Sequence, residues 1–212
     1  MLNIIGISGS PVKDGNVEMF LQTMLMHAEE RGARTTAINL SRLHIADCNH
    51  CNFCLKRQKA GKYCAQEDDV QGVYELLETA DIIVLASPVY FMRLSGQMAS
   101  FVDRLRVFVF GNIAGGSLKN KIGISAAVAW ARHGGFETTH LTHITAFLTL
   151  EMLPVSVHHC ISPLGASAVA SQGGTGFFDK AHRHGVTLDE VGLHSGRAMI
   201  ERGLELARLV KR

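Results

Sequence analysis

The 212 residues of this chain suit one α/β domain of above-average size. Apolar residues make up 47% of the sequence and charged residues 19%, which excludes a disordered chain, and a net charge of +2 gives no general attraction to nucleic acid. No apolar run is long enough to span a bilayer, and the N-terminus lacks the features of a signal peptide, so we expect a cytoplasmic protein with neither a nucleic-acid nor a membrane partner.

Short β-branched runs alternate with longer segments of helical periodicity, which predicts βαβ units around a parallel sheet. The predicted strands are residues 3–8, 34–40, 82–86, 121–129 and 155–161. The predicted helices are residues 17–31, a short helix that begins at Asp68-Asp69, 95–110 with Ser95 as its cap, 137–150 and 188–210. This order predicts one flavodoxin-like domain over residues 1–212: a doubly wound, five-stranded parallel sheet in the order 2-1-3-4-5, with helices on both faces.

The connections after strands 1, 3 and 4 of such a sheet meet at one carboxyl edge, because the crossovers are right-handed, and ligands bind at that edge. Two other connections, residues 41–67 and 162–187, are long, so we expect them to carry function or an oligomer contact. Residues 41–67 form a cysteine-rich insertion, since they hold four of the five cysteines.

The first of these connections, from Gly6 to Asn16, is rich in glycine and hydroxyl groups. Glycines let backbone amides converge on an anion, hydroxyls add donors, and the start of the helix adds partial positive charge. The Walker lysine and the glycine pattern of dinucleotide sites are missing, and the strand ending at Leu40 offers no carboxylate for a ribose. A phosphate monoester such as that of flavin mononucleotide (FMN) fits best, and an ordinary strand-to-helix turn is the alternative.

The connections after strands 3 and 4 could enclose a flat ring. The first runs from Ser87 to Phe91, where a proline stiffens the chain and aromatic side chains can wall a planar ligand. The second contains Trp130, Arg132 and the pair Gly134-Gly135, and an arginine or backbone amide there could stabilise a reduced, anionic flavin. Core packing is the alternative role for Phe91 and Trp130.

The cysteine spacing within residues 41–67 indicates metal chemistry. Cys48, Cys51 and Cys54 stand at three-residue intervals, and Cys64 follows after nine intervening residues. This pattern lets one tight loop offer three thiolates to a [4Fe-4S] cube, with the distant cysteine completing it. The alternatives are a tetrahedral zinc site, a redox-active thiol pair, and a loop that holds no metal. His50 is a possible substitute ligand for either the cluster or zinc.

These motifs together resemble the NADPH-dependent FMN reductase family, and with the cysteines the chain is most similar to its iron-sulfur flavoprotein branch. The resemblance covers residues 1 to about 160 and rests on Ser8-Gly9-Ser10-Pro11 with Gly15-Asn16, on Ser87-Pro88-Val89-Tyr90, and on the segment from Gly134 to Thr139. It implies that Ser8, Ser10, Val12 and Asn16 hold the FMN phosphate. The residues expected to bind FMN are Ser8, Ser10, Val12, Gly15, Asn16, Val17, Pro88, Val89, Tyr90, Phe91, Arg132, His133, Gly134, Gly135 and Phe136. The residues expected to bind the cluster are Cys48, Cys51, Cys54 and Cys64.

The chain departs from the family pattern at three points. Val17 stands where relatives often have Thr or Ser, and Phe136 replaces a glutamine that commonly follows the paired glycines. Cys64 follows later than the fourth cysteine of the branch's compact motif. The extra residues, 55–63, carry four basic side chains that would offset the negative charge of a thiolate cluster.

The expected function is an FMN-dependent oxidoreductase that moves electrons between a reduced donor, NAD(P)H or ferredoxin, and a small-molecule or protein acceptor. A flavin exchanges two electrons as hydride and a [4Fe-4S] cluster passes one at a time, so the pair would convert between the two. We expect a homodimer or homotetramer. The alternatives are a clusterless NAD(P)H-dependent FMN or quinone reductase on the same fold, and a non-catalytic FMN- or zinc-binding interaction module.

Other residues with ligand chemistry form no recognisable motif. The eleven histidines include no His-Glu-x-x-His pattern, and we expect each to be structural or solvated. Cys160, on the predicted fifth strand, is expected to be a small buried apolar residue.

Overall fold

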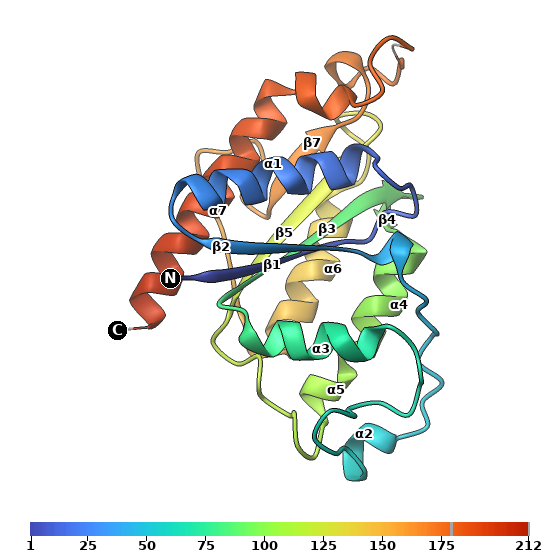
Figure 1. Cartoon of the computed structure of the whole chain (residues 1–212). Coiled ribbons are helices and arrows are strands. Elements are labelled where there is room, and N and C mark those ends of the chain that lie inside the picture. Colours follow the sequence, from blue (N-terminus) through green and yellow to red (C-terminus); the bar gives the residue numbers. More distant parts are fainter. Residues whose placement is uncertain (179, 212) are drawn as a thin grey trace.

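A parallel sheet lies between two layers of helices in the computed structural model, which describes residues 1–178 and 180–211 (Figure 1). The strands are β1 (Asn3–Ser8), β2 (Arg34–Asn39), β3 (Ile82–Tyr90), β4 (Arg93–Leu94), β5 (Ile122–Ala129), β6 (Leu153–Pro154) and β7 (Ala166–Val169). Their order is β2-β1-β3-β5-β6, all parallel, with β7 also parallel to β5 and β4 antiparallel to β3.

Helices cover both faces of the sheet, and each face has its own apolar core. One face carries α1 (Asn16–Glu30) and α7 (Glu190–Val210), and the other carries α3 (Val70–Thr79), α4 (Gly96–Arg104), α5 (Arg106–Val109) and α6 (Phe136–Thr149). Successive residues of β1 illustrate the division, because Ile4 packs in the first core and Ile5 in the second. The prediction of a doubly wound, flavodoxin-like fold is therefore confirmed.

The prediction of five strands is wrong: two short strands, β6 and β7, share the fifth position, and β4 pairs with β3, which makes a sheet of seven. β6 pairs with the start of β5 and β7 with its end, and residues 155–165 leave the sheet between them. Val155 and Val157 are buried while Ser156 and His158 are exposed, so the alternation that predicted a strand is present. Alternation reports which side chains are buried and not which backbone groups pair; Pro163, which has no N–H, disfavours a continuous ladder here.

The predicted helix over residues 95–110 is divided. Ser95 caps α4 as expected, its Oγ accepting a hydrogen bond from the Met98 N–H at 3.0 Å, but α4 ends at Arg104 and the short α5 follows after Leu105. The sequence also did not predict β4, the short helix α2 (Phe53–Lys56) within the cysteine segment, or the 3-10 turns over Leu40–Arg42, Gln172–Gly174 and Gly185–Leu188. No helix within the two described ranges is both long and apolar enough to cross a membrane.

Candidate flavin and metal sites

A cavity of about 720 Å³ opens at the carboxyl edge of the sheet. It lies where the first connection, the end of β3, the end of β5 and the segment before α7 meet. Its lining residues are Ser10, Val12, Gly15, Asn16, Val17, Pro88, Val89, Tyr90, Phe91, Val128, Ala129, Trp130, Ala170, Phe178 and Arg183. Nine of the fifteen residues expected to bind FMN therefore line one cavity, and Ser8, buried beneath it, holds Ser10 by accepting its backbone N–H at 3.4 Å.

One end of this cavity offers donors suited to a phosphate. α1 begins there after Gly15, and no side chain in the described ranges caps its first turn, so the partial positive charge of the helix start faces the cavity. Ser10 folds the loop by accepting the Val12 N–H at 3.1 Å. A Cβ at Gly15 would lie 3.0 Å from Val12 Cγ1, so glycine permits this close turn. The donor set fits the phosphate monoester of FMN.

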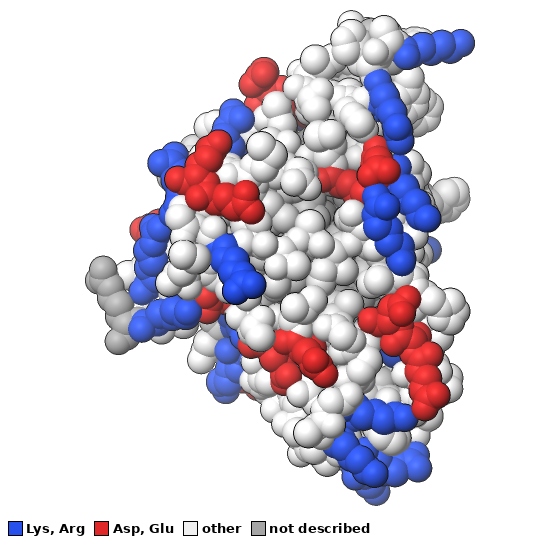
Figure 2. Space-filling view, viewed as in Figure 1, with Lys and Arg blue, Asp and Glu red and all other residues white. Residues whose placement is uncertain are grey.

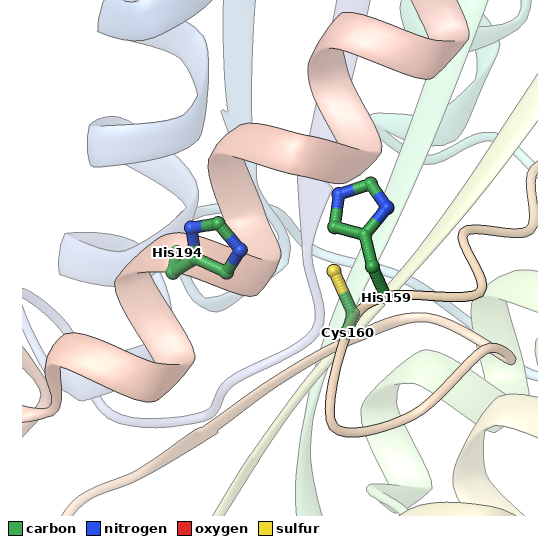
Figure 3. Close-up of side chains that lie close together, drawn as sticks. All are labelled: His159, Cys160 and His194. Carbon is green, nitrogen blue, oxygen red and sulfur yellow. The ribbon is translucent and has the colours of Figure 1, made fainter.

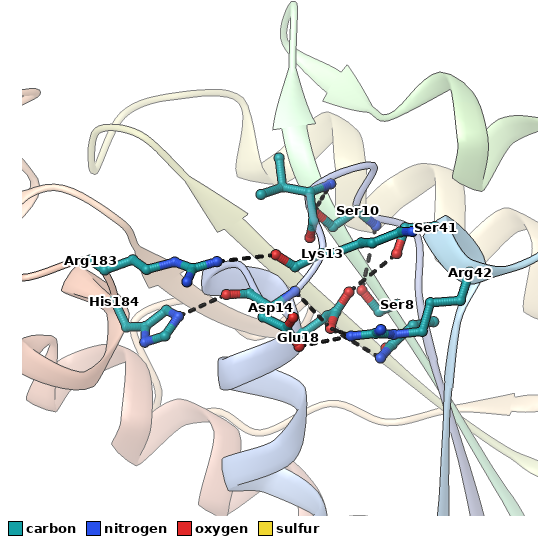
Figure 4. Close-up of polar contacts among 11 residues, drawn as sticks. Ser8, Ser10, Lys13, Asp14, Glu18, Ser41, Arg42, Arg183 and His184 are labelled. Carbon is teal, nitrogen blue, oxygen red and sulfur yellow. Dashed lines mark hydrogen bonds and ion pairs between the residues drawn. The ribbon is translucent and has the colours of Figure 1, made fainter.

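The loop that forms this end is held from two sides (Figure 4). On one side the carboxylate of Glu18, which is 9% exposed, accepts hydrogen bonds from the Asp14 N–H at 3.1 Å and from Asn39 Nδ2 at 3.0 Å. On the other side Arg183 Nη2 donates to the Lys13 carbonyl at 3.4 Å. Protein groups therefore contact the loop from both sides.

Asn16 and the segment from Arg183 to Val186 connect the loop to the C-terminal part of the chain. Asn16 Oδ1 accepts the Val186 N–H at 3.0 Å, and Asn16 Nδ2 donates to the Arg183 carbonyl at 3.4 Å. His184 Nε2 donates to the Asp14 carbonyl at 2.8 Å. Arg183 adds a cationic side chain to the cavity lining. No motif in the sequence indicated this residue; the only indication was the length of the connection over residues 162–187.

The opposite end of the cavity is apolar and aromatic. Trp130 and Phe178 stack with their ring centroids 5.9 Å apart and an angle of 4° between the planes. Tyr90 and Phe91 stand at the mouth, and Phe91 is fully exposed. Exposed aromatic side chains around an apolar cavity suit a planar ring system.

The predicted residues from Arg132 to Phe136 do not line this cavity. Arg132 forms a two-pronged ion pair with Asp189, with Nη2 2.7 Å from Oδ1 and Nη1 3.2 Å from Oδ2. Phe136 is buried and stacks on His140 with centroids 6.3 Å apart, and Gly135 adopts the left-handed conformation (φ 93°) just before α6. These residues form the connection between Trp130 and α6.

A second site forms where the four clustered cysteines meet. Cys48, Cys51, Cys54 and Cys64 line one small cavity of about 20 Å³, with Cys54 buried on α2 and both Cys48 and Cys51 exposed. Two left-handed residues, His50 (φ 56°) and Asn52 (φ 60°), separate the first three cysteines and turn the chain between them. Histidine and asparagine adopt this conformation more readily than most residues, so the intervening residues suit the turn.

The long spacing before Cys64 closes as a hairpin. Lys59 and Lys62 exchange backbone hydrogen bonds of 3.0 and 2.9 Å, which reverses the chain and returns Cys64 to the other thiols. Gln58, which is 4% exposed, anchors the hairpin, because its side chain donates to the Val107 carbonyl at 3.1 Å and accepts the Ala114 N–H at 3.0 Å. The nine-residue insertion is thus compatible with four converging cysteines.

Basic groups surround the cysteines. Lysine and arginine side chains gather at the lower right of Figure 2, over α2. Burial raises the pKa of the Cys54 thiol, and the nearby Arg106 guanidinium offsets part of that rise. Metal binding at this site would release thiol protons, and the surrounding cations would offset the resulting negative charge.

Comparison with known proteins identifies the family of the chain. The model of the NADPH-dependent FMN reductase family matches residues 2–165. An iron-sulfur flavoprotein of Methanocaldococcus jannaschii is 31% identical over 98% of this chain and 98% of its own length. Another, of Archaeoglobus fulgidus, is 34% identical over 96% of each chain. The crystal structure of RosB with bound 8-demethyl-8-formylriboflavin-5'-phosphate has a TM-score of 0.73 at 16% identity, covering 100% of this chain and 81% of that one. The chain belongs to the NADPH-dependent FMN reductase family and is an FMN-dependent oxidoreductase.

Proposed function

We propose that this oxidoreductase carries electrons between FMN in the 720 Å³ cavity and a [4Fe-4S] cluster held by Cys48, Cys51, Cys54 and Cys64. The observation that carries the proposal is the convergence of these four thiols on one cavity, in spite of the long spacing before Cys64. Relatives of similar length that match almost the whole chain are named iron-sulfur flavoproteins, which supports the same assignment.

The spread of the thiols favours a cluster over zinc. Zn–S bonds of about 2.3 Å in a tetrahedron place the sulfur atoms roughly 3.8 Å apart. No three of the four thiols, all in the described part of the chain, lie within 4.8 Å of one another. Four thiolates also match the ligand set of an iron-sulfur cube.

Bound FMN supplies two-electron chemistry that can be divided into single electrons. The first connection and the start of α1 would bind its phosphate, and Arg183 would add a positive charge there. Trp130, Phe178 and Tyr90 would hold the ring and exclude water from one of its sides. The donor would be NAD(P)H or a reduced ferredoxin, and the acceptor a small molecule or a protein.

We also propose that the protein is cytoplasmic and acts as a homodimer or homotetramer, and the placement of the two sites supports the oligomer. The two cavities share no lining residue, and α2 lies at the opposite end of the molecule from β7 in Figure 1. Electron transfer between sites so separated within one chain would be aided by a second subunit that brings its cysteine segment to the flavin cavity. We therefore propose that electrons pass between subunits.

Anaerobic purification with iron, sulfide and flavin analysis tests the cluster. The wild-type protein should contain about four irons per chain, as expected for a [4Fe-4S] cube. Cys54→Ser should lose the iron and sulfide but keep FMN, because Cys54 lies outside the flavin cavity. Cys160→Ser is the matched control and should keep its iron. Full iron in Cys54→Ser, or none in the anaerobic wild type, would contradict the proposal.

A clusterless NAD(P)H-dependent FMN or quinone reductase is the second candidate. The cavity between the thiols has a volume of about 20 Å³, which favours this second candidate. A [4Fe-4S] cube enters only if the exposed loop from Cys48 to Asn52 moves outward. Flavin reduction by NADPH in a preparation without iron would support this candidate.

Replacing Asn16 by Asp is expected to weaken FMN binding by about tenfold or more, equivalent to about 1.4 kcal/mol. The aspartate keeps the acceptor for the Val186 N–H but loses the donor to Arg183 and adds negative charge beside the phosphate site. Titration with FMN, followed by flavin fluorescence, measures the change. Asn120→Asp adds the same charge at an exposed turn far from the cavity and should bind like the wild type. An unchanged affinity of Asn16→Asp would mean that the phosphate lies elsewhere.

A further inference from the structure

The geometry points to a zinc site formed by His159, Cys160 and His194, apart from the flavin and cysteine sites. One ligand atom from each of these side chains lies within 4.8 Å of the other two. Among the residues that the structure describes, no other three His, Cys, Asp or Glu side chains bring ligand atoms this close together. None of the three lines the flavin cavity or the cysteine cavity.

The three side chains come from two separate elements (Figure 3). His159 and Cys160 belong to the connection between β6 and β7, and His194 belongs to α7. The two histidines are exposed and Cys160 is half-buried against the core that α1 and α7 share. The site is therefore open to solvent on one side and supported by packing on the other, so an ion can enter and a water molecule can complete its coordination.

The donor set selects the metal. Two imidazoles and a thiolate suit zinc, whereas calcium and magnesium prefer oxygen donors, which this group lacks. Tetrahedral zinc needs donor atoms about 3.5 Å apart, so the side chains must close by at most roughly 1.3 Å, within reach of side-chain rotation. His158 is adjacent, with its ring edge-on to His159 and centroids 5.2 Å apart, and is available as a fourth ligand.

The position of the site gives it a structural role. Residues 155–165 leave the sheet at the point where a continuous edge strand would run, and α7 packs against β5 and β7 beside them. Binding replaces the thiol proton of Cys160 with zinc and joins this connection to α7. Zinc would thus fix the edge of the sheet where backbone pairing is interrupted, and it involves no electron transfer.

Zinc content per chain is the first test, measured after the anaerobically purified, FMN-loaded protein is dialysed against zinc and then against buffer. The wild type should hold one more zinc ion per chain than either Cys160→Ser or His194→Ala. Zinc should raise the thermal unfolding midpoint of the wild type by several degrees and should leave that of the two variants unchanged. His44→Ala removes an exposed histidine outside the group and should behave like the wild type. Equal zinc in the wild type and in both variants would overturn the proposal.

Alkylation of Cys160 in the wild type is the second test, and it does not depend on whether a variant folds. Zinc should slow iodoacetamide labelling of Cys160 at least tenfold, as measured by peptide mass spectrometry. Labelling at the same rate with and without zinc would overturn the proposal. Because labelling is read at Cys160 and iron is measured separately, the result is independent of whether Cys48, Cys51, Cys54 and Cys64 hold a cluster.

Discussion

Replacing Asp68 by Asn is expected to lower the free energy of unfolding by about 3–5 kcal/mol, because it leaves the Arg104 guanidinium buried without its countercharge. The two side chains are each 1% exposed and form a two-pronged pair, with Arg104 Nη1 2.6 Å from Asp68 Oδ2 and Nη2 3.1 Å from Oδ1. Denaturant unfolding followed by circular dichroism measures the loss.

The same pair fixes the start of the cysteine segment. Asp68 Oδ2 accepts the Ala46 N–H at 2.9 Å, and Arg104 Nη1 donates to the Ala46 carbonyl at 2.6 Å. Both backbone groups of a residue two positions before Cys48 are therefore held by one ion pair. We expect Asp68→Asn to lower iron retention as well as stability, which links the buried charge to the metal site.

The neighbouring acid supplies the control. Asp69 also accepts a backbone hydrogen bond, from the His44 N–H at 2.7 Å, but this bond is exposed. Asp69→Asn should therefore cost less than about 1 kcal/mol. If the two variants are equally stable, the Asp68–Arg104 pair contributes nothing beyond its backbone hydrogen bond.

The pH dependence of this difference has a defined sign. Burial by itself raises the pKa of Asp68, but the hydrogen bonds from Arg104 and Ala46 outweigh it, so the pKa lies below its ordinary value. A lowered carboxyl pKa stabilises the folded state above the unfolded pKa of about 4, and this contribution is lost as the pH falls toward the folded pKa. The gap between wild type and Asp68→Asn should therefore be complete at neutral pH and shrink in acid.

The fold and much of the flavin cavity could be predicted because they depend on local pattern. Apolar periodicity marked β1, β3 and β5, and the topology of a doubly wound sheet then brings the connections after them together. The residues that were missed or placed elsewhere depend on long-range contacts. Arg132 forms an ion pair with Asp189, 57 residues further along the chain, and no local sequence pattern predicts that ion pair. Arg183 reaches the cavity from a connection with no regular periodicity.

The cysteine segment shows how much of a metal site can be predicted from the spacing of its cysteines alone. Three cysteines at equal short intervals already implied one loop facing one ligand, and the structure places them around one cavity. The position of Cys64 could not be deduced in this way, because the hairpin over residues 59–62 is held by Gln58, whose partners lie at Val107 and Ala114. The prediction of a fifth strand was wrong for a related reason. Burial alternates over residues 155–158, but backbone pairing depends on the neighbouring strand of the sheet.

Two buried histidines are expected to make a large contribution to the pH dependence of stability. Ser125 Oγ lies 2.7 Å from His140 Nδ1 and 2.8 Å from His143 Nδ1, and His140 Nε2 lies 2.8 Å from Ser167 Oγ. One hydroxyl can donate only one hydrogen, so one of the two Nδ1 atoms must carry a proton and donate. His143 Nε2 is buried with no partner in the described structure, and an unpartnered acceptor costs less than an unpartnered N–H. This assigns the chain His143 Nδ1–H to Ser125, Ser125 O–H to His140 Nδ1, and His140 Nε2–H to Ser167.

Burial lowers the pKa of His140 to about 4, and burial, followed by the neighbouring His140, lowers that of His143 to about 3. Both rings are therefore neutral in the folded protein but take up protons in the unfolded chain near pH 6.5. A depressed histidine pKa contributes stability above the unfolded value and loses it as the pH falls toward the folded value. With two protons taken up on unfolding, the free energy of unfolding should drop by about 2.7 kcal/mol per pH unit below pH 6.

Denaturant midpoints measured anaerobically between pH 7 and pH 5 test this slope. His143→Leu removes one of the two groups, so its slope should be about half that of the wild type, whatever its absolute stability. His44→Ala removes an exposed histidine and should leave the slope unchanged. An undiminished slope in His143→Leu would assign the acid sensitivity to other groups. A halved slope would show that the Ser125 network keeps its two imidazoles neutral. Phe136, which stacks on His140, would then pack against an uncharged ring.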